Sequence, residues 1–202
     1  MITSPEMIQP NLAAKSIAKI NFQGLYDLGF RILILDKDNT LTLHNSNNIE
    51  KDDIILSLEK AKEIFGNKNI AVFTNNDKIK EITINHKSSG IFVIESFSKK
   101  PFCEEDVINH FVKNSGLNEV DIRDPKKYVI IGDRLMTDVA LAYRMGSLGI
   151  YVEPFELSRE SANIRQARKF ENFIWKNLQN LKKRNFFTNF EKEEKLNFCI
   201  KK

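Results

Sequence analysis

Four short apolar stretches of the chain are each followed by polar side chains of the types that handle phosphate. The polar segments are DKDNT at 36–40, TNN at 74–76, KKP at 99–101 and GDRLMTD at 132–138. Taken singly, such residues are common in turns and helix caps. Together they bring carboxylates, a hydroxyl and an ammonium group to one edge of a sheet, which predicts a site for a phosphate ester.

The two aspartates of the first segment suit the chemistry of ester cleavage. A phosphate monoester hydrolyses very slowly in water and needs a nucleophile, a proton for the leaving oxygen and positive charge beside the phosphoryl group. Asp36 is expected to be the nucleophile, because its carboxylate can form an acyl phosphate. Asp38 would protonate the leaving group and then deprotonate the attacking water.

The acidic residues also suit a divalent cation. The side chains of Asp36 and Asp133 and the backbone carbonyl of Asp38 form an all-oxygen ligand set, which Mg²⁺ prefers while it keeps waters or substrate phosphate in its other positions. Bound magnesium would also remove the repulsion between an anionic nucleophile and an anionic ester. We therefore expect Mg²⁺ as the cofactor.

Other polar groups of these segments are expected to bind the substrate. The hydroxyl of Thr74, with Asn75 beside it, would donate to the phosphoryl group, and Lys100 would neutralise it. Lys100 is preferred to Lys99 because it directly precedes a proline, which favours an extended backbone.

Two residues of the fourth segment have alternative roles. Asp138 either orients Lys100 or supports the metal, or it is a first-turn carboxylate that a helix dipole favours. Arg134 either contacts a second anionic group of the substrate or lies on the surface, paired with Asp138.

These segments are positioned by an α/β fold with a parallel sheet, because the hydrophobic pattern alternates between strands and helices. We expect strands over 31–35, 69–73, 91–94, 127–131 and 148–152, and helices over 51–65, 77–88, 104–114 and 138–144. In such sheets, ligands bind outside the carboxyl ends of the strands, where the polar segments lie.

Composition excludes several other classes of protein. The 202 residues are 42% hydrophobic and 29% charged, which suits one domain with tails. Cys103 and Cys199 are too few and too far apart for a disulfide framework or a cysteine-rich zinc module. His44, His86 and His110 do not cluster at metal-ligand spacing and are expected on the surface. No apolar stretch approaches the roughly 20 residues of a membrane span.

Charge is distributed unevenly along the chain. From residue 159 onward there are 12 Lys and Arg against 5 Asp and Glu, a net charge of +7, whereas the preceding part is net −3. A basic tail indicates contact with an anionic surface, or a solvated charged helix. Its helical stripe at 170–181 is expected to pack on the sheet rather than on lipid, and 186–198 to contact a membrane. The segment 8–22 is a candidate surface helix.

Several stretches carry a resemblance to a known family: LDKDNTLT at 35–42, FGN at 65–67, FTN at 73–75, GDRLMTDV at 132–139, RMGS at 144–147 and IRQARKFE at 164–171. They resemble the haloacid dehalogenase superfamily of phosphatases and, within it, the mitochondrial-type phosphatidylglycerophosphate phosphatases. The similarity runs from about residue 10 to about residue 176.

The resemblance implies a three-layer Rossmann-like sandwich with a central parallel sheet, with an N-terminal segment at 1–24, a phosphatase core at 25–158 and a C-terminal basic amphipathic extension at 159–202. It implies Mg²⁺-dependent removal of the terminal phosphate of phosphatidylglycerophosphate, the step that feeds cardiolipin synthesis, on the matrix face of the mitochondrial inner membrane. The N-terminus itself lacks the arginine-rich character of a good import signal.

The spacing of the segments also favours a large substrate. The 38 residues from Asp36 to Thr74 and the 26 from Thr74 to Lys100 are each used by a helix and a strand, so no cap domain is expected and 42–49 forms only a small flap. An open site suits a lipid headgroup still in its membrane, with no nucleic acid and no obligate protein partner. The alternatives are a phosphatase for another bulky ester, such as a polynucleotide end or a phosphoprotein, and a non-catalytic membrane adaptor.

Overall fold

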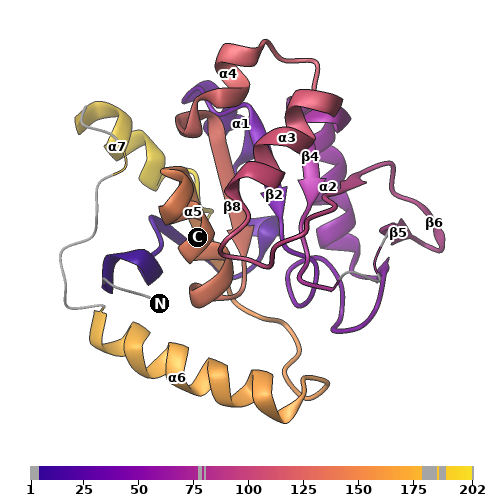
Figure 1. Cartoon of the computed structure of the whole chain (residues 1–202), viewed down its shortest axis with the longest axis vertical. Helices are drawn as coiled ribbons and strands as arrows, with labels where there is room; N and C mark the ends of the chain where they lie inside the picture. Colours follow the sequence, from indigo (N-terminus) through magenta and orange to yellow (C-terminus); the bar gives the residue numbers. More distant parts are fainter. Residues whose placement is uncertain (1–4, 77–78, 80, 179–185, 187–189, 202) are drawn as a thin grey trace.

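The computed structural model describes residues 5–76, 79, 81–178, 186 and 190–201. In these ranges a six-stranded sheet lies at the centre of the molecule, with helices on both faces (Figure 1). The expected α/β fold with a parallel sheet is confirmed. None of the helices in this part of the chain is long and apolar enough to cross a membrane.

The strands of the central sheet are all parallel and lie in the order β1-β9-β8-β2-β4-β7. Their bounds are β1 (Leu12–Ala14), β2 (Ile32–Leu35), β4 (Ile70–Val72), β7 (Phe92–Val93), β8 (Tyr128–Gly132) and β9 (Leu148–Val152). All but β1 lie within one residue of the expected ranges, because short apolar runs rich in β-branched residues suit parallel strands that are covered on both faces.

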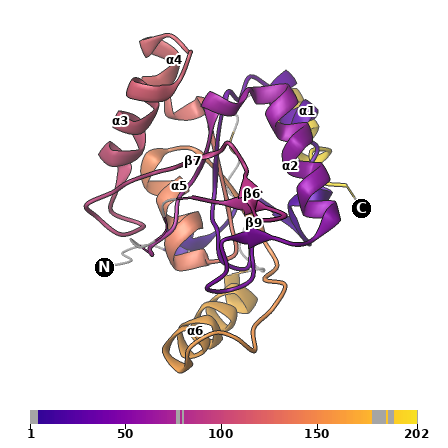
Figure 2. The ribbon, with the colours of Figure 1, turned by 90° about the vertical axis from the view of Figure 1, so that its right-hand side faces the viewer.

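The helices cover the two faces of the sheet. On one face lie α1 (Phe22–Asp27) and α2 (Asp52–Phe65), and on the other α3 (Glu104–Asn114), α4 (Glu119–Arg123) and α5 (Ala140–Met145) (Figure 2). Beyond the edge of the sheet where β9 ends lies α6 (Ala162–Leu178), and α7 (Phe190–Asn197) is the last helix. The helices expected over 51–65 and 104–114 are confirmed.

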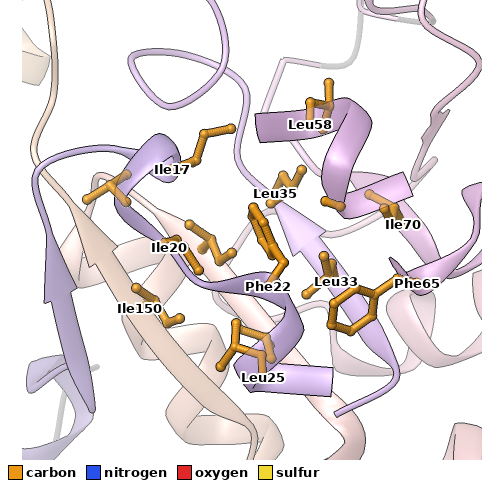
Figure 3. Close-up of a cluster of buried hydrophobic side chains, with 14 of the residues drawn as sticks. Ile17, Ile20, Phe22, Leu25, Leu33, Leu35, Leu58, Phe65, Ile70 and Ile150 are labelled. Carbon is orange, nitrogen blue, oxygen red and sulfur yellow. The ribbon is translucent and has the colours of Figure 1, made fainter. Parts of the chain in front are cut away.

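Alternate strand residues build a hydrophobic core on each face, because successive side chains of a strand point to opposite sides. Leu33 and Leu35 of β2 pack against side chains of α1 and α2 (Figure 3). Ile32 and Ile34 belong to a second core with Phe111 of α3. Because both faces are packed, the carboxyl ends of the strands form a rigid edge from which polar side chains can project.

The N-terminal segment is part of the sheet and does not form the surface helix for which 8–22 was a candidate. β1 pairs with β9, with Leu12 opposite Ile150, and Ile17 and Phe22 are buried in the core. Without β1, the unpaired N–H and C=O groups of β9 would form an open sheet edge. That partner lies far along the chain, where a local pattern does not reveal it.

The helix expected over 77–88 is also wrong in its described part, 79 and 81–88. There β5 (Thr83–Ile84) and β6 (Lys87–Ser88) form a hairpin, and β5 also pairs with β3 (Asn48–Ile49) in a separate small sheet. Asn85 and His86 form the turn with φ of 49° and 63°, a left-handed backbone that tight hairpins require. Residues 77, 78 and 80 lie outside the described residues.

One side of α6 packs against the body of the protein. Ile174 and Trp175 are half-buried beside Ile8 and Leu135. By contrast, Phe170 and Phe173 are 55% and 67% exposed. The stripe expected at 170–181 therefore packs only in part, and its last three residues lie outside the described residues.

The end of the chain folds back onto the core. Phe186 is buried with its ring centre 5.5 Å from that of Phe30, and the N–H of Asn21 donates to the carbonyl of Cys199 at 2.7 Å. The membrane contact expected for 186–198 is therefore wrong for Phe186, whose ring is needed to cover the core. Of the other phenylalanines there, Phe187 and the side chain of Phe190 lie outside the described residues.

Phe186→Ala tests this docking of the chain end. We expect it to lower the free energy of unfolding by about 3 kcal/mol, because a buried ring leaves a cavity when it is removed. Phe198→Ala, at a ring that is 75% exposed, should change the free energy by less than about 0.5 kcal/mol. Urea denaturation measures both, and equal effects would contradict the packing of Phe186.

Candidate active site

The four polar segments meet at the carboxyl edge of the central sheet and line one open pocket. Its walls come from the ends of β2, β4 and β8, from the loop before α3 and from the segment leading into α6. The lining residues are Asp36, Asp38, His44, Asn45, Thr74, Asn75, Asn76, Lys100, Asp133, Arg134, Thr137, Glu160, Ile164 and Arg168. Of the residues expected at the site, Asp138 alone is absent from this lining, because it is buried beside Lys100.

Lys100 is the central cation of the pocket, whereas Lys99 is exposed. Its buried ammonium donates to Asp36 Oδ1 at 2.5 Å, to Asp138 Oδ1 at 2.5 Å and to the carbonyl of Phe73 at 2.8 Å. Burial by itself lowers the pKa of Lys100, but the charges of Asp138 and Asp36 outweigh it and raise the pKa above its ordinary value. Lys100 is therefore positively charged, with all three N–H bonds directed at acceptors.

Three carboxylates gather around this cation. One oxygen from each of Asp36, Asp133 and Asp138 lies within 4.8 Å of the others. Burial raises the pKa of Asp36 to about 6, although Lys100 lowers it. Burial, followed by the charge of Asp36, also raises the pKa of Asp133 well above its ordinary value. Burial thus disfavours the charged form of Asp36 and Asp133, and the oxygens of the cluster fit a divalent cation that would offset this cost.

Within this cluster, Asp36 and Asp133 are better placed as metal ligands than Asp138. Both oxygens of Asp138 are already engaged, Oδ1 by Lys100 and Oδ2 by the backbone N–H of Arg134 at 3.2 Å. Of the alternatives for Asp138, the contact that orients Lys100 is the one the structure contains.

The turn after β8 brings Asp138 back to the end of its own strand. Residues Leu135–Val139 form a π-helical turn, a form that is rare and frequent at functional sites. A Cβ atom on Gly132 would lie 2.3 Å from the carboxylate carbon of Asp138. Glycine is therefore needed at 132 for Asp138 to reach Lys100.

Asp38 is held at the pocket wall by its own loop. Its Oδ1 accepts hydrogen bonds from the ammonium of Lys37 at 2.7 Å and from the N–H of Asn45 at 3.0 Å. His44, which was expected on the surface, lines the pocket with Nδ1 3.8 Å from the same oxygen. The side chain of Asp38 thus lines the pocket, and the role of its backbone carbonyl as a metal ligand remains a prediction.

The residues after β4 have structural contacts as well as pocket positions. The side-chain oxygen of Asn75 accepts the backbone N–H of Lys100 at 2.8 Å, which ties the loop before α3 to the end of β4. The Thr74 hydroxyl accepts the N–H of Asn76 at 3.2 Å and keeps its own proton for another acceptor.

Glu160, Ile164 and Arg168 of the C-terminal segment also line the pocket. None of these three residues was predicted at the site from the sequence. Arg134 is bound to Glu171 of α6 by three hydrogen bonds of 2.8 to 3.0 Å. Arg168 of α6 pairs with the carboxylate of Asp133 and with Glu160. Arg168 and Glu171 are three positions apart, so they share a helix face, but nothing local indicates which surface that face meets.

Gly132→Ala tests the close approach of Asp138. We expect the added methyl group to displace the Asp138 carboxylate and to lower the free energy of unfolding by about 1–3 kcal/mol, as overpacking usually does. Gly116→Ala is the matched control, because nothing lies within 4 Å of its Cβ position and its φ is not positive. Urea denaturation of both variants provides the measurement, and a Gly132→Ala protein as stable as wild type would refute the contact.

Comparison with known proteins points to one family. A family described as mitochondrial PGP phosphatase matches residues 1–154. Phosphatidylglycerophosphate phosphatase 1, chloroplastic/mitochondrial, of Arabidopsis thaliana is 29% identical over 179 residues, which are 85% of this chain and 48% of that protein. The mitochondrial phosphatidylglycerophosphatase of Saccharomyces cerevisiae is 25% identical over 158 residues, 75% of this chain and 81% of its own.

A chloroplastic phosphatidylglycerophosphate phosphatase 1 of Chlamydomonas reinhardtii is 28% identical over 174 residues, 81% of this chain and 60% of that protein. This chain spans about half the length of the Arabidopsis relative. No solved structure matches this chain. The family match includes the ends of β2, β4 and β8 and the loop that carries Lys100, so the chain belongs to the mitochondrial PGP phosphatase family.

Proposed function

We propose that this protein is a Mg²⁺-dependent phosphatase that hydrolyses phosphatidylglycerophosphate to phosphatidylglycerol and phosphate. The observation that carries the proposal is the buried Lys100 ammonium, set between Asp36 and Asp138 beside an open pocket. A fixed cation next to a carboxylate is what attack on a phosphoryl group needs. Membership of the family supports the substrate, which its relatives carry in their names.

The reaction would proceed in two displacements at phosphorus. The Asp36 carboxylate attacks the terminal phosphorus, the bond to the glycerol oxygen breaks, and Asp38 gives that oxygen a proton, so that phosphatidylglycerol leaves. Asp38 then takes a proton from water, which attacks the aspartyl phosphate and releases inorganic phosphate. Lys100 stabilises the phosphoryl oxygens in both steps, and the Thr74 hydroxyl donates to them.

The metal would be held by the side chains of Asp36 and Asp133 and by the carbonyl of Asp38. When bound, Mg²⁺ supplies positive charge that offsets the repulsion between the Asp36 carboxylate and the dianionic ester. The raised pKa of Asp36 and of Asp133 supports this assignment, since burial disfavours their negative charge and a bound cation would offset that cost.

A large substrate is supported by what lies between the polar segments. From Asp36 to Thr74 the chain forms β3, α2 and β4, and from Thr74 to Lys100 the described residues form β5, β6 and β7. These are short elements of the core and of one small sheet, which leaves the pocket open. We propose that the protein has no cap domain and that it acts on a headgroup still in its bilayer.

We also propose that α6 contacts the membrane beside the pocket. Ile164 and Arg168 at its start line the pocket, whereas Phe170 and Phe173 are exposed farther along the helix. A membrane that touches these rings would thus contact the same helix that lines the pocket.

The charge of α6 fits an anionic surface. Lys169 and Lys176 are exposed beside the two rings, and the single acidic residue of the helix, Glu171, is buried. Each basic residue near anionic lipid contributes on the order of 1 kcal/mol. The family and the yeast relative are named as mitochondrial, and we propose that this surface is the matrix face of the mitochondrial inner membrane.

Phosphate release from phosphatidylglycerophosphate in vesicles tests the activity. The purified protein should release phosphate with Mg²⁺ and stop when a chelator is added. Asp36→Asn should lower kcat by about 10⁴-fold or more, because the nucleophile is lost, and Asp38→Asn by about 10²–10⁴-fold with folding and metal binding intact. Asp52→Asn, at an exposed site in the first turn of α2, is the control and should match wild type.

Two outcomes would overturn this assignment. Equal rates on a phosphorylated oligonucleotide or a phosphopeptide would remove the lipid specificity. Activity that survives Asp36→Asn would remove the proposed nucleophile.

Sedimentation with vesicles that contain phosphatidylglycerol tests the membrane surface. Replacing both Phe170 and Phe173 with Ser should weaken binding about tenfold or more, because two apolar rings no longer enter the interface. Leu56→Ser, at a side chain 71% exposed on α2, should leave binding unchanged. Hydrolysis of the water-soluble ester p-nitrophenyl phosphate should stay normal in both variants, and undiminished vesicle binding of the double variant would contradict the role of α6.

A further inference from the structure

Arg168 on α6 is a buried guanidinium that uses its donors on two carboxylates at once. Its Nε donates to both oxygens of Glu160 at 2.8 Å, and its Nη1 donates to the backbone carbonyl of Asp133 at 2.9 Å. Its Nη2 bonds the Asp133 carboxylate and, at 2.5 Å, Glu160 Oε1. Arg168 thus binds Asp133 through both its backbone carbonyl and its side-chain carboxylate.

Glu160 connects Arg168 to the loop after β2, which carries Asp36 and Asp38. Its Oε1 accepts from the side-chain amide of Asn39 at 2.8 Å, and the Asn39 side-chain oxygen accepts the N–H of Glu156 at 3.2 Å. Asn39 follows Asp38 directly and has a φ of 61°, in the left-handed region. A chain of hydrogen bonds therefore connects the loop after β2 with the loop after β8.

The members of this chain are removed from solvent. Asn39 is 0% exposed, Glu160 4%, Arg168 8% and Asp133 1%. Buried ion pairs contribute little net stability, because desolvation offsets the attraction, whereas the planar fork of arginine fixes the geometry of its partners. The arrangement is better suited to positioning two loops than to holding the fold together.

We propose that Arg168 and Glu160 are positioning residues of the active site, which hold the Asp133 carboxylate and the loop of Asp36 and Asp38 in the geometry for binding the metal. Arg168 occupies one oxygen of Asp133, which leaves the other for a cation. The segment that contains Glu160 and α6 therefore contributes residues that position the catalytic groups. The inference rests on the metal site of the proposed function.

Arg168→Lys and Glu160→Gln test the proposal, because the first keeps the charge but loses the fork, and the second keeps the shape but loses the charge. We expect each to weaken Mg²⁺ binding in calorimetry by about 10–100-fold, the usual effect of losing a partner that orients a metal ligand. The kcat on p-nitrophenyl phosphate should fall by a similar factor with a smaller change in KM. The double variant should lose little more than either single one, since the pair acts as a unit.

Arg123→Lys, at an arginine ion-paired on the surface of α4, is the matched control and should match wild type. A folded Arg168→Lys or Glu160→Gln protein with unchanged or tighter Mg²⁺ binding and unchanged kcat would overturn the positioning role, even if its melting temperature falls. A wild-type protein that neither binds Mg²⁺ nor releases phosphate would instead overturn the proposed function.

Discussion

Buried charge at the carboxyl edge of the sheet is the constraint on which the rest of the structure depends. Asp36 and Asp138 lie against Lys100 there, and Asp133 and Glu160 lie against Arg168, with all six side chains buried. A buried charge without a partner costs several kcal/mol, and each of these acids lies against a cation. These carboxylates outnumber the cations that pair with them, and the oxygens of Asp36, Asp133 and Asp138 could hold a metal ion.

The elements that meet this constraint come from distant parts of the chain. Lys100 lies 64 residues from Asp36 and 38 from Asp138, and α6 supplies Arg168 from beyond the sheet. The packed cores on both faces of the sheet keep the strand ends in fixed positions, and the loops between them carry the side chains. A rigid sheet with polar loops at one edge can therefore hold like charges close together without being distorted by their repulsion.

Some features could be predicted because local patterns are sufficient for them. The strands β2, β4, β7, β8 and β9 follow from short apolar runs, and the convergence of Asp36, Thr74 and Asp133 follows from the parallel order of those strands. The strand β1 could not be predicted in this way, because its partner β9 lies far along the chain. The β5–β6 hairpin is local, but β5 also pairs with the remote strand β3, which the pattern at 77–88 does not contain. Phe186 was misassigned for the same reason, since an aromatic side chain among lysines looks alike whether it meets lipid or a core.

The amino-acid sequence by itself determined the chemistry that the protein can perform, because residue types and their spacing after strands decide which acids, hydroxyl and ammonium group reach the sheet edge. Only the tertiary structure decided which cation meets which carboxylate. Arg134 adjoins Asp133 in the chain yet bonds Glu171, while Asp133 is held by Arg168. The rotation and position of α6 make that choice, and they are set by the packing of Ile174 and Trp175 against remote side chains, which no local pattern contains.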